Sequence, residues 1–194
     1  MKTGTLASLS NSIFASLGVV GAQDELGIGT SPELRECLVL IDGMGAQSLA
    51  EFGKSHSIFS QSSINQNLNS HFPTTTTVNL TSLGTGVLPG IHGMLGYTVR
   101  VPRSGEPGRL LNALKWDERV DPIIWQKVPT LFERAEAQGI NVSQVSAKRY
   151  EGTGFTRAAL RGAQYIGANQ ISEIVDSAAN SLSKPNSFTY VYIN

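Results

Sequence analysis

The chain has 194 residues, of which 40% are hydrophobic and 15% are charged, and its 15 basic and 15 acidic residues balance at pH 7. A chain of this length and composition can bury the core of one ordinary soluble domain, which excludes the disordered and fibrous classes. The balanced charge gives no support for a nucleic acid partner, and no apolar stretch approaches the roughly 18 residues of a membrane-spanning helix. We therefore expect no nucleic acid or membrane partner, and a cytoplasmic location is the default.

The first part of the chain predicts an amphipathic helix. Leu6, Leu9, Ile13, Leu17 and Val20 recur at spacings of three and four, as on one face of a helix that ends near a following glycine. Serine and asparagine interrupt the apolar character of this segment, so we interpret it as part of the folded protein and not as a signal peptide.

A strand, a turn and a helix are predicted next. Residues 37–41 form an apolar run of strand length that stops at Asp42-Gly43, ahead of a helical pattern over residues 46–52. Cys37 is the single cysteine of the chain and lies inside the apolar run. We therefore expect a small buried thiol there, and a disulfide within the chain is excluded.

The middle of the chain is rich in turn residues. Residues 55–70 contain few apolar side chains and lead to Pro73, after which residues 74–83 predict a helix that a threonine side chain can cap. Residues 97–109 mix proline, glycine and charge, which is typical of an exposed loop or hairpin.

The second half alternates between helical and extended patterns. We predict helices over residues 130–138 and 171–182 and strands over residues 140–145, 164–166 and 187–193. Strands that alternate with helices predict an α/β fold with a mostly parallel sheet flanked by helices on both faces.

Asp42 and the threonine run at residues 74–77 are the candidates for chemistry. Asp42 directly follows a predicted strand, where ligands of open α/β sheets bind, and its carboxylate can hold Zn²⁺, Mg²⁺ or Mn²⁺. A threonine at a helix N-terminus meets free amides that favour a phosphate, and its hydroxyl can attack phosphorus once a base or metal activates it. However, Asp-Gly is also a common turn and threonine a common cap, so these residues alone leave both interpretations open.

Three segments sharpen the interpretation. They are Leu-Val-Leu-Ile-Asp-Gly at residues 38–43, Phe-Pro-Thr-Thr-Thr-Thr at residues 72–77, and Gly-Thr-Gly-x-x-Pro-x-x-His-Gly at residues 84–93. In order and spacing they resemble the type I phosphodiesterase/nucleotide pyrophosphatase family of the alkaline phosphatase superfamily. The resemblance implies an alkaline-phosphatase-like core in which Asp42 is a metal ligand and Thr76 is both nucleophile and metal ligand, with Thr75 as its nearest rival.

The resemblance also implies the chemistry of the complete enzyme. It is a hydrolase of phosphoric esters that acts on a small-molecule phosphate ester or nucleotide through two divalent metal ions, with Zn²⁺ preferred to Mn²⁺ or Mg²⁺. Tyr97 departs from the family pattern, since it stands where this branch carries a phosphoryl-binding asparagine. Its hydroxyl can still donate a hydrogen bond to a phosphoryl oxygen.

Other polar residues receive structural interpretations. We expect His92 in a turn, a local hydrogen bond from Asn79, no ligand role for His56 or His71, and a solvated helix face for Arg157 and Arg161.

The motifs that complete the family's two-metal site are missing. An Asp-x-x-x-His motif, an Asp-His pair and a later histidine do not occur after Thr76, so the resemblance carries over only two metal-binding residues. We therefore expect residues 1–194 to be the N-terminal portion of a single catalytic domain, truncated at its C-terminus and inactive by itself. The alternatives are a non-catalytic remnant or binding module with the same half-fold, and a metal-dependent phosphomutase.

Overall fold

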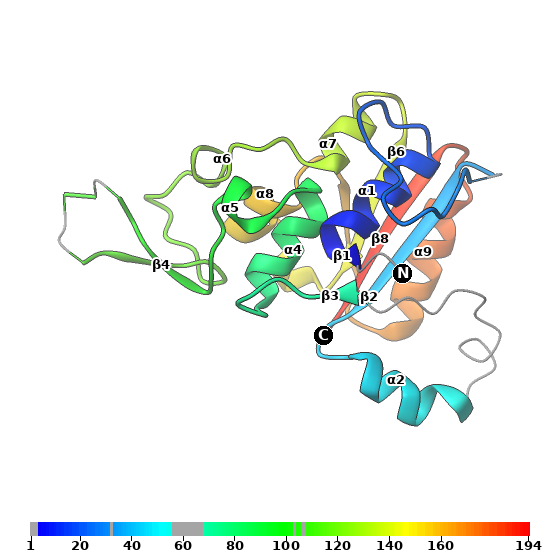
Figure 1. Ribbon diagram of the computed structural model, residues 1–194, viewed down its shortest axis with the longest axis horizontal. Helices are drawn as coiled ribbons and strands as arrows, with labels where there is room; N and C mark the ends of the chain where they lie inside the picture. Colours follow the sequence, from blue (N-terminus) through cyan, green and yellow to red (C-terminus); the bar gives the residue numbers. More distant parts are fainter. Residues whose placement is uncertain (1–3, 32, 56–67, 103, 106–107) are drawn as a thin grey trace.

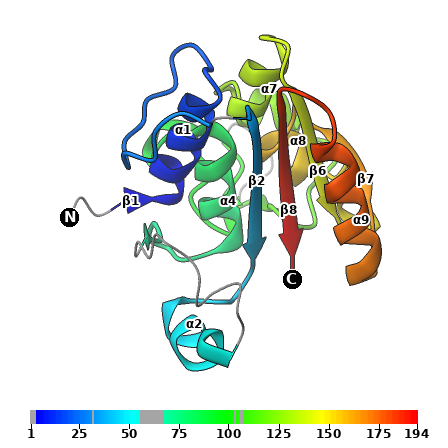
Figure 2. The ribbon, with the colours of Figure 1, turned by 90° about the vertical axis from the view of Figure 1, so that its right-hand side faces the viewer.

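Four parallel strands form the central sheet. Their spatial order is β2 (Arg35–Ile41), β8 (Ser187–Ile193), β6 (Asn141–Ser146) and β7 (Gln164–Gly167). The structure is a computed structural model that describes residues 4–31, 33–55, 68–102, 104–105 and 108–194 (Figure 1). Because the strands are parallel, their carboxyl ends lie at one edge of the sheet, and Figure 2 shows the arrowheads of β2 and β8 pointing to that edge. The predicted mostly parallel α/β sheet is confirmed.

Helices pack on both faces of β8, whose side chains alternate between two cores. Phe188 and Tyr190 contact the larger core, which is built with α1 (Leu6–Ser16), α4 (Thr76–Thr85) and α7 (Leu131–Glu136). Val191 points the other way, into a small core with α9 (Ile171–Leu182). The ring of Phe188 lies 4.6 Å from that of Phe14 and 5.5 Å from that of Phe132, measured between centroids. These buried rings fix the helical layer on the sheet.

The remaining elements are short and connect the main layers. They are β1 (Gly4–Thr5), α2 (Ala46–Phe52), η1 (Gly53–Ser55), β3 (Leu68–Asn69), α5 (Pro89–His92), β4 (Thr98–Arg100), β5 (Leu110–Asn112), α6 (Pro122–Trp125), η2 (Lys148–Tyr150) and α8 (Gly154–Ala159). The antiparallel hairpin of β4 and β5 extends away from the sheet on the left of Figure 1. It agrees with the loop or hairpin predicted over residues 97–109.

The helix α4 is locked against its neighbour α8. A Cβ atom placed on Gly84 would lie 1.9 Å from the carbonyl oxygen of Ala159, so only glycine permits this approach. At its end, Gly86 adopts a left-handed conformation with φ of 70°. The helix begins two residues later than predicted, and within the described residues no threonine side chain caps it, because Thr75 Oγ1 contacts Thr77 Oγ1 instead.

Most predicted elements agree with the structure. The helices over residues 46–52 and 171–182 and the strand over residues 187–193 have the predicted bounds. Most of the turn-rich segment over residues 55–70, including His56, lies outside the described residues. Among the helices of the described chain, none combines the length and apolar character that crossing a bilayer requires.

Two predictions about burial are wrong. The helix α1 ends at Ser16, so Val20 lies beyond it and is 78% exposed instead of joining the apolar face. Cys37 is exposed, not buried, because β2 is an edge strand of which one face is largely open. Val39, two residues along on the same face, is 53% exposed.

Candidate active site

The carboxyl edge of the sheet positions Asp42. Its backbone N–H donates to the carbonyl oxygen of Ile193 at 2.8 Å, which continues the pairing of β2 with β8 by one residue. Gly43 then turns the chain with φ of 77°, and α2 begins three residues further on. The Asp42 carboxylate therefore lies just beyond the carboxyl end of β2, where open α/β sheets bind ligands.

Thr76 meets Asp42 although 34 residues separate them in sequence. Thr76 is the first residue of α4, and its Oγ1 donates a hydrogen bond of 3.1 Å to Asp42 Oδ2. The structure thus brings together the two residues that the sequence singles out. The N-terminal end of α4 also directs free backbone amides and the positive end of the helix dipole toward this point.

Two tyrosines complete the polar cluster. The Tyr192 hydroxyl donates to Asp42 Oδ2 at 2.6 Å, and the Tyr97 hydroxyl lies 3.1 Å from Thr76 Oγ1. Because the single hydroxyl hydrogen of Thr76 is directed to a carboxylate, Tyr97 must be the donor in its contact with Thr76. Burial, followed by the hydrogen bond to Asp42, raises the pKa of Tyr192 well above its usual value, so this phenol remains a neutral donor.

Two cavities meet at this cluster, and Asp42, Thr76 and Tyr97 line both. A cavity of about 760 Å³ lies between the turn after β2 and the start of α4. A second cavity, of about 340 Å³, extends past the carboxyl ends of β6 and β8. Both volumes are suitable for small ligands, which bind in pockets of about 300–1,000 Å³. A substrate held at Thr76 thus has space on two sides.

Asn79 fixes the loop that precedes Thr76. Its Oδ1 accepts from the backbone N–H of His71 at 2.8 Å, and its Nδ2 donates to the carbonyl oxygens of His71 and Thr75 at 3.2 and 3.1 Å. This loop contains a cis peptide bond between Phe72 and Pro73. The expected local role of Asn79 agrees with these contacts, which hold the N-terminus of α4 in place.

His92 has the structural role that the sequence predicts. It is 2% exposed, its Nδ1 accepts from the backbone N–H of Met94 at 3.0 Å, and its Nε2 lies 3.0 Å from Ser82 Oγ. Burial is the main cause that lowers the pKa of His92 to about 4. The imidazole is therefore neutral at pH 7 and ties the end of α5 to α4.

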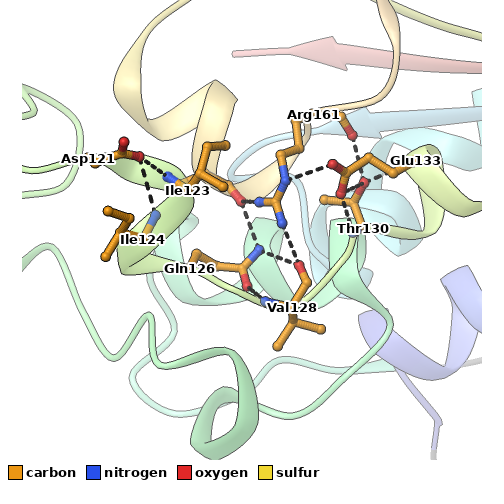
Figure 3. A network of polar contacts seen from close by, with 9 residues as sticks. Asp121, Ile123, Ile124, Gln126, Val128, Thr130, Glu133 and Arg161 are labelled. Atoms are coloured by element: carbon orange, nitrogen blue, oxygen red, sulfur yellow. Dashed lines mark hydrogen bonds and ion pairs between the residues drawn. The ribbon is translucent and has the colours of Figure 1, made fainter.

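The prediction of a solvated face for Arg161 is wrong. Figure 3 shows its guanidinium group among protein acceptors: it forms an ion pair with Glu133 at 3.0 Å and donates to the carbonyl oxygens of Ala158 and Val128 at 2.6 and 2.7 Å. These contacts connect α7 and α8, and the side chain is only 13% exposed. Arg157, on the same helix as Ala158, is exposed as predicted. Neither arginine lines the two cavities.

The donor atoms at the cluster fit part of a metal site. A carboxylate and a hydroxyl offer the hard oxygen ligands that Mg²⁺ and Mn²⁺ prefer and that Zn²⁺ accepts. In the part of the chain that the structure describes, however, no three His, Cys, Asp or Glu side chains come together to hold a metal ion. Asp42 and Thr76 thus offer two oxygen donors, and the described residues add no histidine, cysteine or further carboxylate to complete a metal site with them.

The sequence did not single out Tyr192. Aromatic and β-branched residues predict its strand, but the alternation of side chains along a strand does not say which face of the strand meets Asp42. The register of β8 against β2 decides this, because it pairs Tyr192 with Leu40, two residues before Asp42.

The parallel sheet and its flanking helices define an α/β protein, and they are consistent with an alkaline-phosphatase-like core. The model of the type I phosphodiesterase/nucleotide pyrophosphatase family matches residues 37–184, and the chain belongs to this family. Its members are phosphodiesterase- and pyrophosphatase-type hydrolases, and they are generally metal-dependent. No match was found among curated proteins or among solved structures.

Proposed function

We propose that this chain carries the nucleophile and one metal-binding carboxylate of a metal-dependent phosphoric-ester hydrolase of the phosphodiesterase/nucleotide pyrophosphatase type. The observation that carries the proposal is the 3.1 Å hydrogen bond from Thr76 Oγ1 to Asp42 Oδ2 at the N-terminus of α4. Membership of a hydrolase family supports the reaction class, and the two adjoining cavities suit a small phosphate ester or nucleotide.

The reaction proceeds in two displacements. In the first, Thr76 Oγ1 gives up its hydrogen and attacks phosphorus, a threonine–phosphate bond forms, and the bond from phosphorus to the leaving oxygen breaks, so that the leaving oxygen departs with a proton. The Thr76 hydrogen already points at Asp42, which orients an oxygen lone pair away from the carboxylate and toward the substrate. In the second displacement, a water oxygen bonds to phosphorus and the bond from phosphorus to Thr76 Oγ1 breaks. One hydrogen of the water restores the Thr76 hydroxyl, and the phosphoryl group leaves with the water oxygen.

Groups around Thr76 favour the charge that develops on the phosphoryl oxygens. The first amides of α4 have no partners within the helix and face an anion placed at its N-terminus. The Tyr97 hydroxyl, 3.1 Å from Thr76 Oγ1, can turn its hydrogen to a phosphoryl oxygen once phosphate is present. This is the position of the asparagine that the resemblance assigns to phosphoryl binding.

Asp42 and Thr76 are the residues that would hold a metal ion, with Zn²⁺ preferred to Mn²⁺ or Mg²⁺. A bound divalent cation would supply activation of the hydroxyl and stabilisation of the leaving oxygen. The family's ligand motifs beyond Thr76 do not occur in this sequence. We therefore do not expect residues 1–194 alone to carry out the two-metal reaction.

A non-catalytic remnant is the second candidate. The observation in its favour is that, within the described residues, no group of three potential acidic, histidine or cysteine ligands forms. Such a protein would keep the fold and one weak cation site. A phosphomutase with the same core is a lesser alternative, which product analysis would distinguish from a hydrolase.

The test is hydrolysis of bis-p-nitrophenyl phosphate and p-nitrophenyl phosphate with added Zn²⁺ or Mn²⁺. We expect activity in a form extended through the downstream reading frame but not in the 194-residue chain. Thr76→Ala should lower the activity by about 10³-fold or more, because it removes the attacking atom. Thr75→Ala, one residue earlier, is the matched control and should keep most of it. Inactivity of every form, with no metal retained, would replace the proposal with the remnant.

A further inference from the structure

The 340 Å³ cavity leads from Thr76 to residues that the proposed reaction does not use. Arg149 and Tyr150 line it from η2, directly after β6, and Asn194 lines it from the end of β8. Leu114 and Phe155 contribute apolar side chains to its walls. The cavity thus has an apolar surface, the nucleophile near one wall and a cation at another.

Arg149 is held only by neutral groups. Its Nη2 donates to the Tyr150 hydroxyl at 2.8 Å and to Asn194 Oδ1 at 3.1 Å, and the guanidinium carbon lies 4.8 Å from the centroid of the Tyr150 ring. Within the described residues, its Nε and Nη1 make no hydrogen bond and no carboxylate pairs with it. Arg109 and Arg161, in contrast, pair with Asp117 and Glu133. Arg149 therefore keeps donors and a charge available to an anion.

The wall between Arg149 and Thr76 is continuous. The Tyr150 ring packs edge-on against Tyr192 with 6.0 Å between centroids, and the Tyr192 hydroxyl bonds to the same Asp42 oxygen that accepts from Thr76. Tyr150 is also fixed at its hydroxyl, which exchanges hydrogen bonds with the Asn194 side chain at 2.7 and 3.0 Å. The guanidinium group is thus positioned before any ligand binds, which lowers the entropic cost of binding.

We propose that Arg149 binds a second anionic group of the substrate while the reacting phosphorus lies at Thr76. The inference rests on the proposed function for the identity of the reacting group. The substrate is then a phosphoric ester or anhydride with two anionic groups, as a pyrophosphate linkage provides. A guanidinium cation with N–H donors that no protein group uses attracts phosphate and carboxylate alike, so the chemistry of the second group is an oxyanion.

Binding of non-hydrolysable anions to the 194-residue chain tests the inference in metal-free buffer. Methylenediphosphonate carries two phosphonates, 3-phosphonopropionate a phosphonate and a carboxylate, and methylphosphonate one phosphonate. We expect calorimetry to give tighter binding of the first two than of the third, and NMR to show a shift of the Arg149 Nε–H resonance. The stronger of the first two ligands identifies the second group as phosphate or carboxylate.

Arg149→Gln should weaken binding of the stronger two-anion ligand by about tenfold or more, because it removes a charge-assisted hydrogen bond, and should leave methylphosphonate unchanged. Lys148→Gln is the matched control. It removes the same charge at the residue directly before Arg149, and Lys148 does not line the cavity. Equal weakening in both variants, no preference for two anions, or no binding by the wild-type chain would overturn the inference.

Hydrolysis distinguishes this inference from the proposed function. If Thr76→Ala abolishes hydrolysis but Arg149→Gln leaves anion binding unchanged, the function stands and the role of Arg149 fails. If Arg149→Gln selectively weakens the two-anion ligand while no form of the protein hydrolyses an ester, the anion subsite stands and the catalytic proposal fails.

Discussion

Asp42 is the residue on which the candidate site converges. Its Oδ2 accepts hydrogen bonds from both Thr76 and Tyr192, whereas Oδ1 has no hydrogen-bond partner among the described residues. Two donors on one oxygen fix the orientation of the carboxylate and leave the other oxygen open to a cation. Under the proposed function Asp42 is a metal ligand, and groups that orient such a ligand commonly affect metal affinity or activity by about 10- to 100-fold.

Tyr192→Phe is therefore expected to weaken metal binding by about tenfold, because Asp42 loses the donor that holds it at 2.6 Å. Calorimetric titration with Zn²⁺ or Mn²⁺ measures the effect. Tyr165→Phe is the control, since its hydroxyl donates to the carbonyl oxygen of Ala147 at 2.7 Å and does not contact Asp42. Equal metal affinity in the wild-type chain and the Tyr192 variant would exclude a positioning role for Tyr192.

At the scale of elements, α4 and α5 form one unit that presents Thr76. The start of this unit is held by Asn79, its middle by the close approach of Gly84 to α8, and its end by His92. His92 is neutral in the folded protein because burial disfavours the imidazolium form. Protonation would place a hydrogen on Nδ1, which could then no longer accept from the backbone N–H of Met94.

The pH dependence of stability follows from the pKa of His92, which falls from 6.5 to about 4 on folding. Between pH 6.5 and about pH 4, His92 is protonated in the unfolded chain but stays neutral in the folded chain. Lowering the pH through this range therefore favours unfolding. The contribution of neutral His92 to the free energy of unfolding is therefore complete above pH 6.5. Up to about 3 kcal/mol of it is lost as the pH falls toward 4. Urea denaturation at several pH values measures this loss.

His92→Gln supplies the comparison for that profile. The variant should be less stable at pH 7, because the contacts with Ser82 and Met94 change, but its stability should fall less between pH 6.5 and 4. The carboxylates titrate in both proteins, so their effect cancels when the free energies of unfolding of wild type and variant are subtracted at each pH. Parallel profiles would show that His92 does not supply the pH dependence.

At the scale of the whole molecule, the sheet is unequally covered. β8 is buried, whereas the edge strand β2 exposes Cys37, Val39 and Ile41 on one face. Exposed apolar residues on an edge strand are prone to pair with another chain. Self-association of the 194-residue chain is therefore the expected behaviour in solution.

Val39→Lys should reduce this association, since it places a charge at the centre of the exposed face of β2. Sedimentation velocity over a range of protein concentrations measures the change. A lysine at the exposed position Val20, which lies outside the sheet, is the control and should leave the association unchanged. A wild-type chain that remains a monomer at high concentration would contradict the expectation.

Much of the fold could be predicted because local patterns carry it. The apolar run before Asp42, the helical period of residues 171–182 and the β-branched residues of the last strand each identify an element with little outside information. The errors at Val20 and Cys37 have one physical cause: a local apolar pattern states that a residue can be buried, but the neighbouring elements decide whether it is.

The sequence by itself determined the α/β class, the family resemblance, and the places of Asp42 after a strand and Thr76 at the start of a helix. Only the tertiary structure decided that Thr76 meets Asp42 across 34 residues and Tyr192 meets it across 150. It also placed Arg149 on a cavity that reaches Thr76. Spacing and periodicity describe neighbours along the chain, whereas these contacts depend on the order and register of parallel strands, which long connections separate.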